Sequence, residues 1–239
     1  MITLSYDLHI HSCLSPCGND DMTPANIVGM AVVNGLDLIA LTDHNSCKNC
    51  PAFLAAAREY GICALPGMEL TTAEEVHVLC LFSDLKDALA WDEYVYAHLI
   101  PVKNNVEIFG KQQIYNENDE ICGTIPNLLI NAADIGFDQV YELVTSFHGI
   151  MIPAHLDKTS TSLLSNLGFI PPDSRFTCAE IQDMTRFHEI KKSNPYLEKC
   201  RIICDSDAHY LEHIHLPQYT ISVKSKDPKD ILSALNTQP

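Results

Sequence analysis

The sequence is short of positive charge and has no long hydrophobic run. Lysine and arginine number 15 against 31 aspartates and glutamates, which gives a formal net charge of −16 at pH 7. Most of the surface would repel a phosphate backbone or an anionic membrane, so stable nucleic-acid binding is not expected. No segment approaches the length needed to cross a bilayer, and the N-terminus lacks the pattern of a secretory signal. We therefore expect a cytoplasmic protein without a membrane partner.

The ten cysteines do not indicate a disulfide framework, because the chain is large and carries no secretory signal. Several of them, such as Cys63, Cys80 and Cys204, lie inside apolar runs, where a reduced thiol packs as a small hydrophobe. Two closely spaced pairs, Cys13 with Cys17 and Cys47 with Cys50, leave other roles open. Together they could form a structural zinc or iron–sulfur site, and a C-x-x-C pair can also be a redox pair or plain thiols.

Apolar segments alternate between the patterns of strands and helices along all 239 residues, without an internal linker. Strands are predicted at 2–11, 36–44, 62–70, 76–82, 150–155, 176–182, 201–209 and 219–223. Helices are predicted at 23–35, 51–61, 87–99, 137–149, 162–168 and 228–236. This β-α alternation favours a single α/β domain, 1–239, built as a closed or nearly closed parallel barrel with its site at the carboxyl ends of the strands.

Residues 101–137 interrupt this alternation. The segment 106–123 has the pattern of a hairpin that turns near Asn116–Asp119, and it is the least regular part of the chain. We expect an excursion or lid here, which with the strand-end loops would set specificity.

Polar residues gather where the predicted strands end. His9 and His11 are one residue apart, so both side chains point to one side of an extended strand. Asp207 and His209 repeat that spacing after a later strand. The other members of this set are Asp43, His44, Glu69, His77 and His155. Mixed imidazole and carboxylate ligands suit zinc, manganese or iron, and a carboxylate can bridge two ions.

The ordered motifs DLHIHS, ALTDHN, GMEL, VHVL, PAH and DSDAH, spread over nearly the whole chain, resemble the PHP family, named for polymerase and histidinol phosphatase. Its members are metal-dependent phosphoesterases. The resemblance implies a distorted (β/α)7 barrel that holds up to three divalent transition-metal ions, zinc, manganese or iron.

Carried over position by position, the resemblance implies ligands for three ions. The first ion would take His9, His11, Glu69 and Asp207, and Glu69 would bridge to a second ion held by His77 and His155. A third ion would use His44 and His209 with one residue of the loop after His11. Family members supply a histidine or aspartate in that loop, whereas this chain offers Cys17 at the spacing of the histidine, with Asp20 and Asp21 close by. Glu69, Asp207 and His209 are the catalytic candidates.

The implied reaction is hydrolysis of a small phosphomonoester, such as a nucleotide, a sugar phosphate or a histidinol-phosphate-like metabolite, by metal-activated hydroxide. Lys158 and Arg186 are candidates to clamp phosphate oxygens, Asn45 is a weaker one, and solvated surface cations are the alternative reading of the first two. Three other functions remain open. They are a nuclease acting on phosphodiesters, a non-catalytic module stabilised by metal, and a redox or metal-handling protein built on the cysteine pairs.

Overall fold

The computed structural model describes residues 1–237. The strands are β1 (Ile2–Ile10), β2 (Leu38–Leu41), β3 (Cys63–Thr71), β4 (His77–Leu81), β5 (Gln113–Tyr115), β6 (Ile121–Thr124), β7 (Ile150–Pro153), β8 (Cys178–Glu180), β9 (Arg201–Ile203) and β10 (Thr220–Val223). The α-helices are α1 (Pro24–Asn34), α2 (Cys50–Tyr60), α3 (Leu85–His98), α4 (Val106–Phe109), α5 (Phe137–Ser146), α6 (Leu163–Asn166), α7 (Phe187–Ser193) and α8 (Pro228–Leu235). Short 3-10 helices are η1 (Met184–Arg186), η2 (Pro195–Lys199) and η3 (Leu211–His213). Within residues 1–237, no helix is both long and apolar enough to span a membrane.

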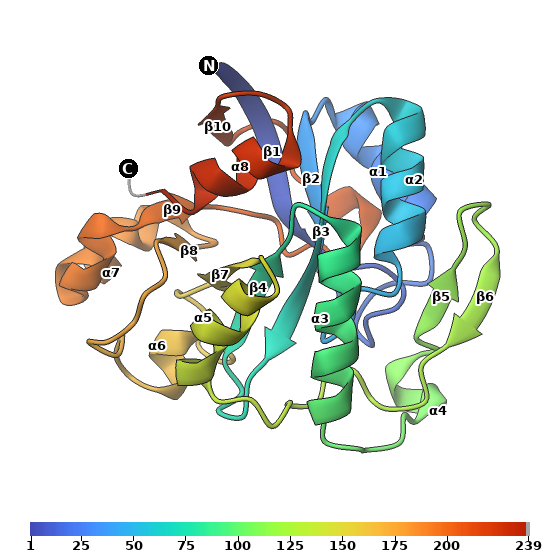
Figure 1. The fold of residues 1–239 in the computed structure, drawn as a ribbon, viewed down its shortest axis with the longest axis horizontal. Helices are drawn as coiled ribbons and strands as arrows, with labels where there is room; N and C mark the ends of the chain where they lie inside the picture. Colours follow the sequence, from blue (N-terminus) through green and yellow to red (C-terminus); the bar gives the residue numbers. More distant parts are fainter. Residues whose placement is uncertain (238–239) are drawn as a thin grey trace.

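Six strands form one curled sheet in the order β10-β1-β2-β3-β4-β7, and β8 pairs with β9 in a separate parallel ribbon. Backbone hydrogen bonds join this ribbon to the sheet on both sides. Leu156, just after β7, donates to the Glu180 carbonyl at 2.9 Å, and His11, just after β1, donates to the Ala208 carbonyl at 2.9 Å. Helices surround the curled strands (Figure 1). The expected α/β fold is confirmed as a curled, half-barrel sheet, while a complete (β/α)7 barrel stays a prediction.

Strand β4 departs from the expected parallel arrangement. Strands β1, β2 and β3 are parallel, but β4 is antiparallel to both of its neighbours, β3 and β7. Only residues 72–76 connect β3 to β4, which is too short for the crossover that a parallel pair requires. The expectation of parallel strands throughout is therefore wrong here, and it is wrong also for β10, which pairs antiparallel with β1. As a consequence β4 begins at the edge where β3 ends, and Thr71 pairs with His77.

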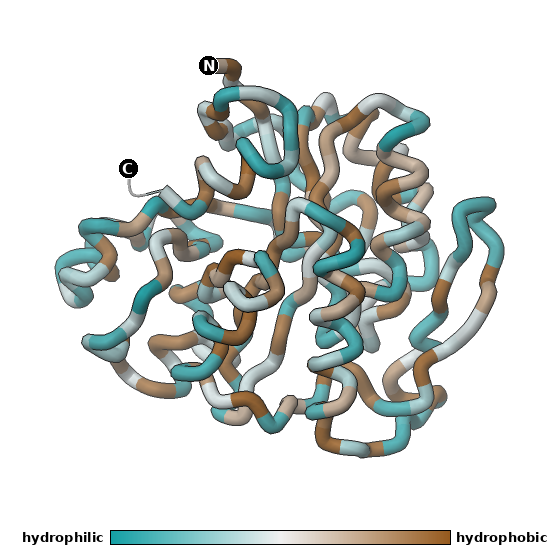
Figure 2. The backbone as a smooth tube through the Cα atoms, in the orientation of Figure 1, coloured by the Kyte–Doolittle hydropathy of each residue, from teal (hydrophilic) through white to brown (hydrophobic). Residues whose placement is uncertain are grey.

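The core has two layers, one inside the curl and one between the sheet and the helices. Leu8, Leu38 and Leu65 belong to the inner cluster, which takes residues from every strand of the curl and from α8. Phe53 and Trp91 belong to the outer cluster, where the apolar faces of the helices cover the sheet. In Figure 2 the hydrophobic colour follows these central segments, whereas the tip of the β5–β6 hairpin is hydrophilic. Burial of both sheet faces explains why the strand sequences are nearly continuous apolar runs.

The segment 101–137 contains α4 and the β5–β6 hairpin, which stands at the side of the molecule beside α2 (Figure 1). The side chain of Asn49 holds the base of the hairpin, because its amide donates to the Gln113 carbonyl at 3.2 Å and accepts from the Tyr115 amide at 2.9 Å. A second feature, helix α7, lies between the two strands predicted at 176–182 and 201–209, where the sequence pattern indicated no element.

Candidate metal centre

The polar side chains of the strand ends converge on the carboxylate of Glu69. Glu69 lies in β3 and is 1% exposed. Its Oε1 atom is 2.9 Å from His77 Nδ1 and 3.0 Å from His155 Nε2. Its Oε2 atom is 3.0 Å from His44 Nδ1. The Nε2 atoms of His9 and His11 are each 3.3 Å from one of the two oxygens. One carboxylate thus lies among five imidazoles from four strands or their ends.

A second carboxylate, Asp207, closes one side of this cluster. Its Oδ1 atom is 3.4 Å from His9 Nε2 and 3.3 Å from His11 Nε2. Asp207 has a φ of 52° and His155 a φ of 30°, both in the left-handed region that side chains with a Cβ rarely adopt. Such strained backbone typically occurs at functional sites, where the surrounding fold maintains it. His209 lies on the same side, with its ring stacked on that of His11 at a centroid distance of 4.3 Å.

Glu180 orients two of these groups from behind. It is completely buried in β8, and both of its oxygens lie 3.0 Å from His9 Nδ1. Its Oε2 also accepts the backbone N–H of His155 at 2.8 Å. A carboxylate at Nδ1 holds a proton there, so the Nε2 atom of His9 faces the cluster. Sequence reasoning missed Glu180, because it occurs inside a short apolar strand and its partner is 171 residues away.

A second network fixes His11 and the loop that follows it. The buried Asp43 carboxylate accepts the Ser12 amide at 2.7 Å and the hydroxyls of Ser12 and Ser15 at 2.6 and 2.7 Å. The Ser15 hydroxyl has then used its proton, so it accepts from His11 Nδ1 at 3.0 Å and from the His44 amide at 3.1 Å. His11 therefore also presents Nε2 to the cluster.

Burial and neighbouring charge shift the pKa values of four of the histidines, upward for His9 and His11 and downward for His44 and His209. Burial lowers the pKa of His44 to about 3 and that of His209 to about 4, so both are neutral near pH 7. Burial also disfavours charge on His9, but Glu180, Asp207 and Glu69 outweigh it and raise the pKa of His9 well above its usual value. Burial would raise the pKa of Glu69, but the surrounding histidines hold it well below the usual range. A cation that enters the cluster would therefore displace protons, chiefly from His9 and its neighbour His11.

The donor set fits divalent transition-metal ions. Three groups of side chains have ligand atoms within 4.8 Å of one another: His9 with His11 and Glu69; His44 with Glu69 and His77; and His11 with Cys17, His44 and His209. Among the described residues, the Nδ1 atoms of His44 and His155 are buried without a geometrically acceptable hydrogen bond. Buried nitrogens of this kind are costly unless something else satisfies them. Imidazole and carboxylate together suit zinc, manganese or iron, and a thiolate suits zinc.

Of the three loop candidates, Cys17 is the one that lies beside the predicted histidine ligands. The Cys17 thiol belongs to the group with His11, His44 and His209, whereas Asp20 and Asp21 are exposed and belong to no such group within residues 1–237. The four cysteines considered as one zinc or iron–sulfur site are not brought together. Cys47 and Cys50 are buried in the outer core cluster, where both thiols contact the Gly67 carbonyl.

The three predicted phosphate-binding residues have different surroundings. Lys158 is half-buried, and its ammonium pairs with Oδ2 of Asp207 at the edge of the cluster. Arg186 is exposed and donates to the Asp157 carbonyl at 2.6 Å, two residues beyond His155. Asn45 uses both amide protons on the carbonyls of Leu129 and Asn131, at 2.7 and 2.8 Å. It therefore has no donor left for a phosphate and instead anchors the segment 101–137.

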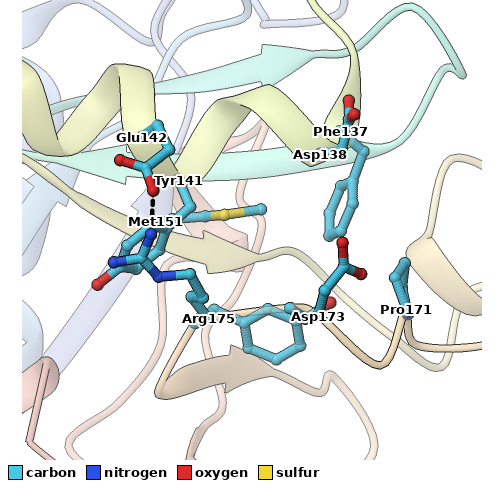
Figure 3. A pocket seen from close by; sticks show the side chains of 10 residues that line it. Phe137, Asp138, Tyr141, Glu142, Met151, Pro171, Asp173 and Arg175 are labelled. Atoms are coloured by element: carbon cyan, nitrogen blue, oxygen red, sulfur yellow. Dashed lines mark hydrogen bonds and ion pairs between the residues drawn. The ribbon is translucent and has the colours of Figure 1, made fainter.

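A separate hollow of about 300 Å³ lies between α5 and the segment 171–176 (Figure 3). Arg175 covers the ring of Tyr141 at 4.4 Å and pairs with Glu142. Phe137 and Met151 also line the hollow. None of the predicted metal ligands lines this hollow, so we do not take it as the candidate functional site.

Comparison with known proteins places this arrangement in context. A family profile described as PHP domain matches residues 7–166. A 5'-3' exoribonuclease of Haemophilus influenzae is 33% identical over 86 residues, which are 35% of this chain and 30% of that protein. The lesion-specific endonuclease Q of Pyrococcus furiosus superimposes with a TM-score of 0.68 and 18% identity over 98% of this chain and 56% of that one. A protein of Bifidobacterium adolescentis gives a TM-score of 0.56 and 16% identity over 98% of this chain and 96% of that one. Metal-dependent phosphoesterase activity has been attributed to that protein. This chain thus spans only part of the two nucleases, and the structural likenesses show the fold.

Proposed function

The chain belongs to the PHP domain family, and from this premise we propose that it is a metal-dependent hydrolase of phosphoric esters. The observation that carries the proposal is the convergence of five imidazoles on the two oxygens of Glu69, all within 3.3 Å. Each buried titratable group costs free energy of folding, and packing or hydrogen bonding alone does not explain so many of them around one carboxylate.

We assign the side chains to as many as three ions of zinc, manganese or iron. His9, His11, Glu69 and Asp207 would hold the first, and Glu69 would bridge to a second held by His77 and His155. His44 and His209 would hold a third with the loop residue. When bound, such ions lower the pKa of water and neutralise charge on phosphate oxygens.

The residues of the chain perform the positioning. Glu180 and Ser15 keep protons on the Nδ1 atoms of His9 and His11, so that their Nε2 atoms stay directed at the cluster. Lys158, whose side chain is 35% exposed, lies beside Asp207 and can turn its ammonium toward a phosphate oxygen. Arg186 donates one guanidinium N–H to the Asp157 carbonyl, and its other N–H groups are proposed to bind a phosphate oxygen. Glu69, Asp207 and His209 are the groups proposed to act closest to the reacting atoms.

A small phosphomonoester is the first candidate substrate, because only two cations, Lys158 and Arg186, are proposed to flank the cluster and the net charge of −16 opposes a long polyanion. A phosphodiester at the end or at a lesion of a nucleic acid is the second candidate. The likeness to an exoribonuclease and to an endonuclease favours this second candidate. The same likeness does not support our expectation that the protein has no nucleic-acid partner. The segment 101–137, anchored through Asn45 and Asn49, is proposed to shape access to the site within the single domain 1–239.

The test is hydrolysis of a panel by chelator-treated protein before and after addition of Mn²⁺ or Zn²⁺. The panel contains nucleoside monophosphates, sugar phosphates, single-stranded RNA and DNA, and duplex DNA with an abasic site. We expect metal-dependent release of phosphate from a small monoester. Cleavage of nucleic acid alone would replace the first substrate with the second. Inactivity toward every ester at full metal content would contradict the proposed function and favour a metal-stabilised binding module.

A further inference from the structure

The loop between His11 and Asn19 is built to bring one thiol to the metal-binding cluster. Cys17 counts as exposed, yet its sulfur lies within 4.8 Å of the ligand atoms of His11, His44 and His209. The loop also carries Cys13, but that residue is buried and belongs to no ligand group in the described part of the chain. Of the two thiols in this loop, the structure thus directs only Cys17 to the histidines.

Backbone hydrogen bonds make this loop two successive tight turns. Ser15 donates to the Ser12 carbonyl at 3.1 Å, and Gly18 donates to the Ser15 carbonyl at 2.9 Å. A Cβ at Gly18 would lie 2.2 Å from the Ser12 carbonyl oxygen, so only glycine fits where the second turn closes. Asn19 then donates to the His209 carbonyl at 3.0 Å, which ties the end of the loop to another member of the cluster. The position of Cys17 is thus fixed from both sides.

The other members of this group are already prepared to bind a cation. His209 directs Nδ1 to the Asp207 carbonyl at 2.8 Å, which leaves Nε2 as the nitrogen that can bind a cation. The Nδ1 atom of His44 is buried without an acceptable hydrogen bond. Two neutral imidazoles and a thiol, with donor atoms within 4.8 Å of one another, form a set that resembles zinc sites with sulfur and nitrogen donors. Manganese prefers oxygen donors and gains little from sulfur.

We propose that Cys17 is a thiolate ligand, and that with His44 and His209 it makes the outer position of the centre a sulfur–nitrogen site selective for zinc-like ions over manganese. The inference rests on the proposed function, since it concerns one position of the same metal centre. The remaining positions, built from imidazole and carboxylate alone, impose no such preference. The two kinds of position can therefore take different metals.

Cobalt(II) tests this proposal, because a cobalt–thiolate bond gives a charge-transfer absorption in the near ultraviolet that imidazole and carboxylate ligands do not give. The full chain is stripped with chelator, titrated with Co²⁺, and then competed with Zn²⁺ or Mn²⁺. We expect the wild-type protein to show the absorption and to lose it to Zn²⁺ but not to equimolar Mn²⁺. In Cys17→Ser the absorption should vanish and zinc affinity at one position should fall at least about tenfold, since loss of even an outer-shell partner costs about 10- to 100-fold.

Matched variants separate the possible outcomes. Cys17→His should restore one equivalent of metal without the absorption, and Cys122→Ser, which removes an exposed thiol on β6, should behave as wild type. Bound cobalt without the absorption in the wild type, or an absorption that persists in Cys17→Ser, would overturn the role of Cys17 and leave the proposed function standing. Failure of the wild type to bind cobalt at all would overturn both.

Discussion

Glu180 offers the sharpest test of how the fold prepares the metal ligands. Its two oxygens lie 3.0 Å from His9 Nδ1, and one of them also accepts the His155 amide at 2.8 Å. In Glu180→Gln the shape is kept, but one of the two oxygens becomes an NH₂ group that can only donate. That group must then face the His155 N–H or the His9 Nδ1 proton. Relief is available if His9 moves its proton to Nε2, which removes the lone pair aimed at the cluster.

The expected magnitude follows from these contacts. Loss of an outer-shell partner of a metal-binding histidine typically costs 10- to 100-fold in metal affinity, or about 1.4 to 2.7 kcal/mol. The metal-free fold should lose less than this. Burial, together with the charges of Glu180 and Asp7, raises the pKa of Asp205 well above its usual value, so neutralising residue 180 removes a repulsion while it weakens a hydrogen bond. We therefore expect a selective loss of metal affinity.

The assay is a zinc titration of the chelator-treated protein against a chromogenic competitor, with thermal unfolding of the metal-free protein measured in parallel. Glu142→Gln is the matched control, because Glu142 is an exposed glutamate that forms a surface ion pair with Arg175. Wild-type zinc affinity in the Glu180 variant would refute the reasoning that this carboxylate sets the orientation and tautomer of His9. An equal loss of affinity in the Glu142 variant would point to general electrostatics.

Three further changes test other parts of the site. Glu69→Gln should weaken binding of more than one metal equivalent and lower turnover by orders of magnitude, because a bridging charge is removed. Elemental analysis and ester hydrolysis measure this, with His98→Gln as the control, and unchanged metal content would exclude bridging. Lys158→Ala should raise KM for a phosphate ester at least about tenfold with metal content retained, because a hydrogen bond to a charged group contributes about 1.5 to 3 kcal/mol; an unchanged KM would remove Lys158 from substrate binding. Asp92→Asn should lower the free energy of unfolding by about 2 kcal/mol, because asparagine keeps the oxygen that accepts from Cys47 and Ser46 but replaces Oδ2, which pairs with Lys48 Nζ at 2.9 Å, by an NH₂ group; urea denaturation measures this, and a shift below about 0.5 kcal/mol would mean that the Lys48 ion pair does not stabilise the fold.

The strands and helices could largely be predicted from local sequence signals. Pro24 at the first helical position and Gly35 in the left-handed conformation after the last one bound α1 as their types predict. The one-residue spacing of His9 and His11 also led directly to their common side, since side chains alternate along a strand. Strand β4 was harder, because an apolar run does not reveal whether it runs parallel or antiparallel to its neighbours. Only the short connection 72–76 carried that information.

The supporting residues of the site could not be predicted, because their roles depend on partners distant in sequence. Glu180 is 171 residues from His9, and Asp43 is 28 residues from Ser15. Asn45 was a candidate for substrate binding because it follows His44 directly and carries an amide donor. Its two donors are nevertheless consumed by carbonyls more than 80 residues away, a distance that no local pattern encodes. The residues at strand ends were visible in the sequence, whereas the network that orients them was not.

The location of bound metal tests the central claim most directly. A crystal of the zinc-loaded protein, measured on both sides of the zinc absorption edge, gives an anomalous map in which only the ions appear. We predict peaks around Glu69, with one peak shared between Glu69 and the pair His77 and His155 and another beside Cys17. A map of the fully loaded protein with no peak in contact with Glu69 would contradict the assignment of this cluster as a metal centre, and with it the proposed hydrolase.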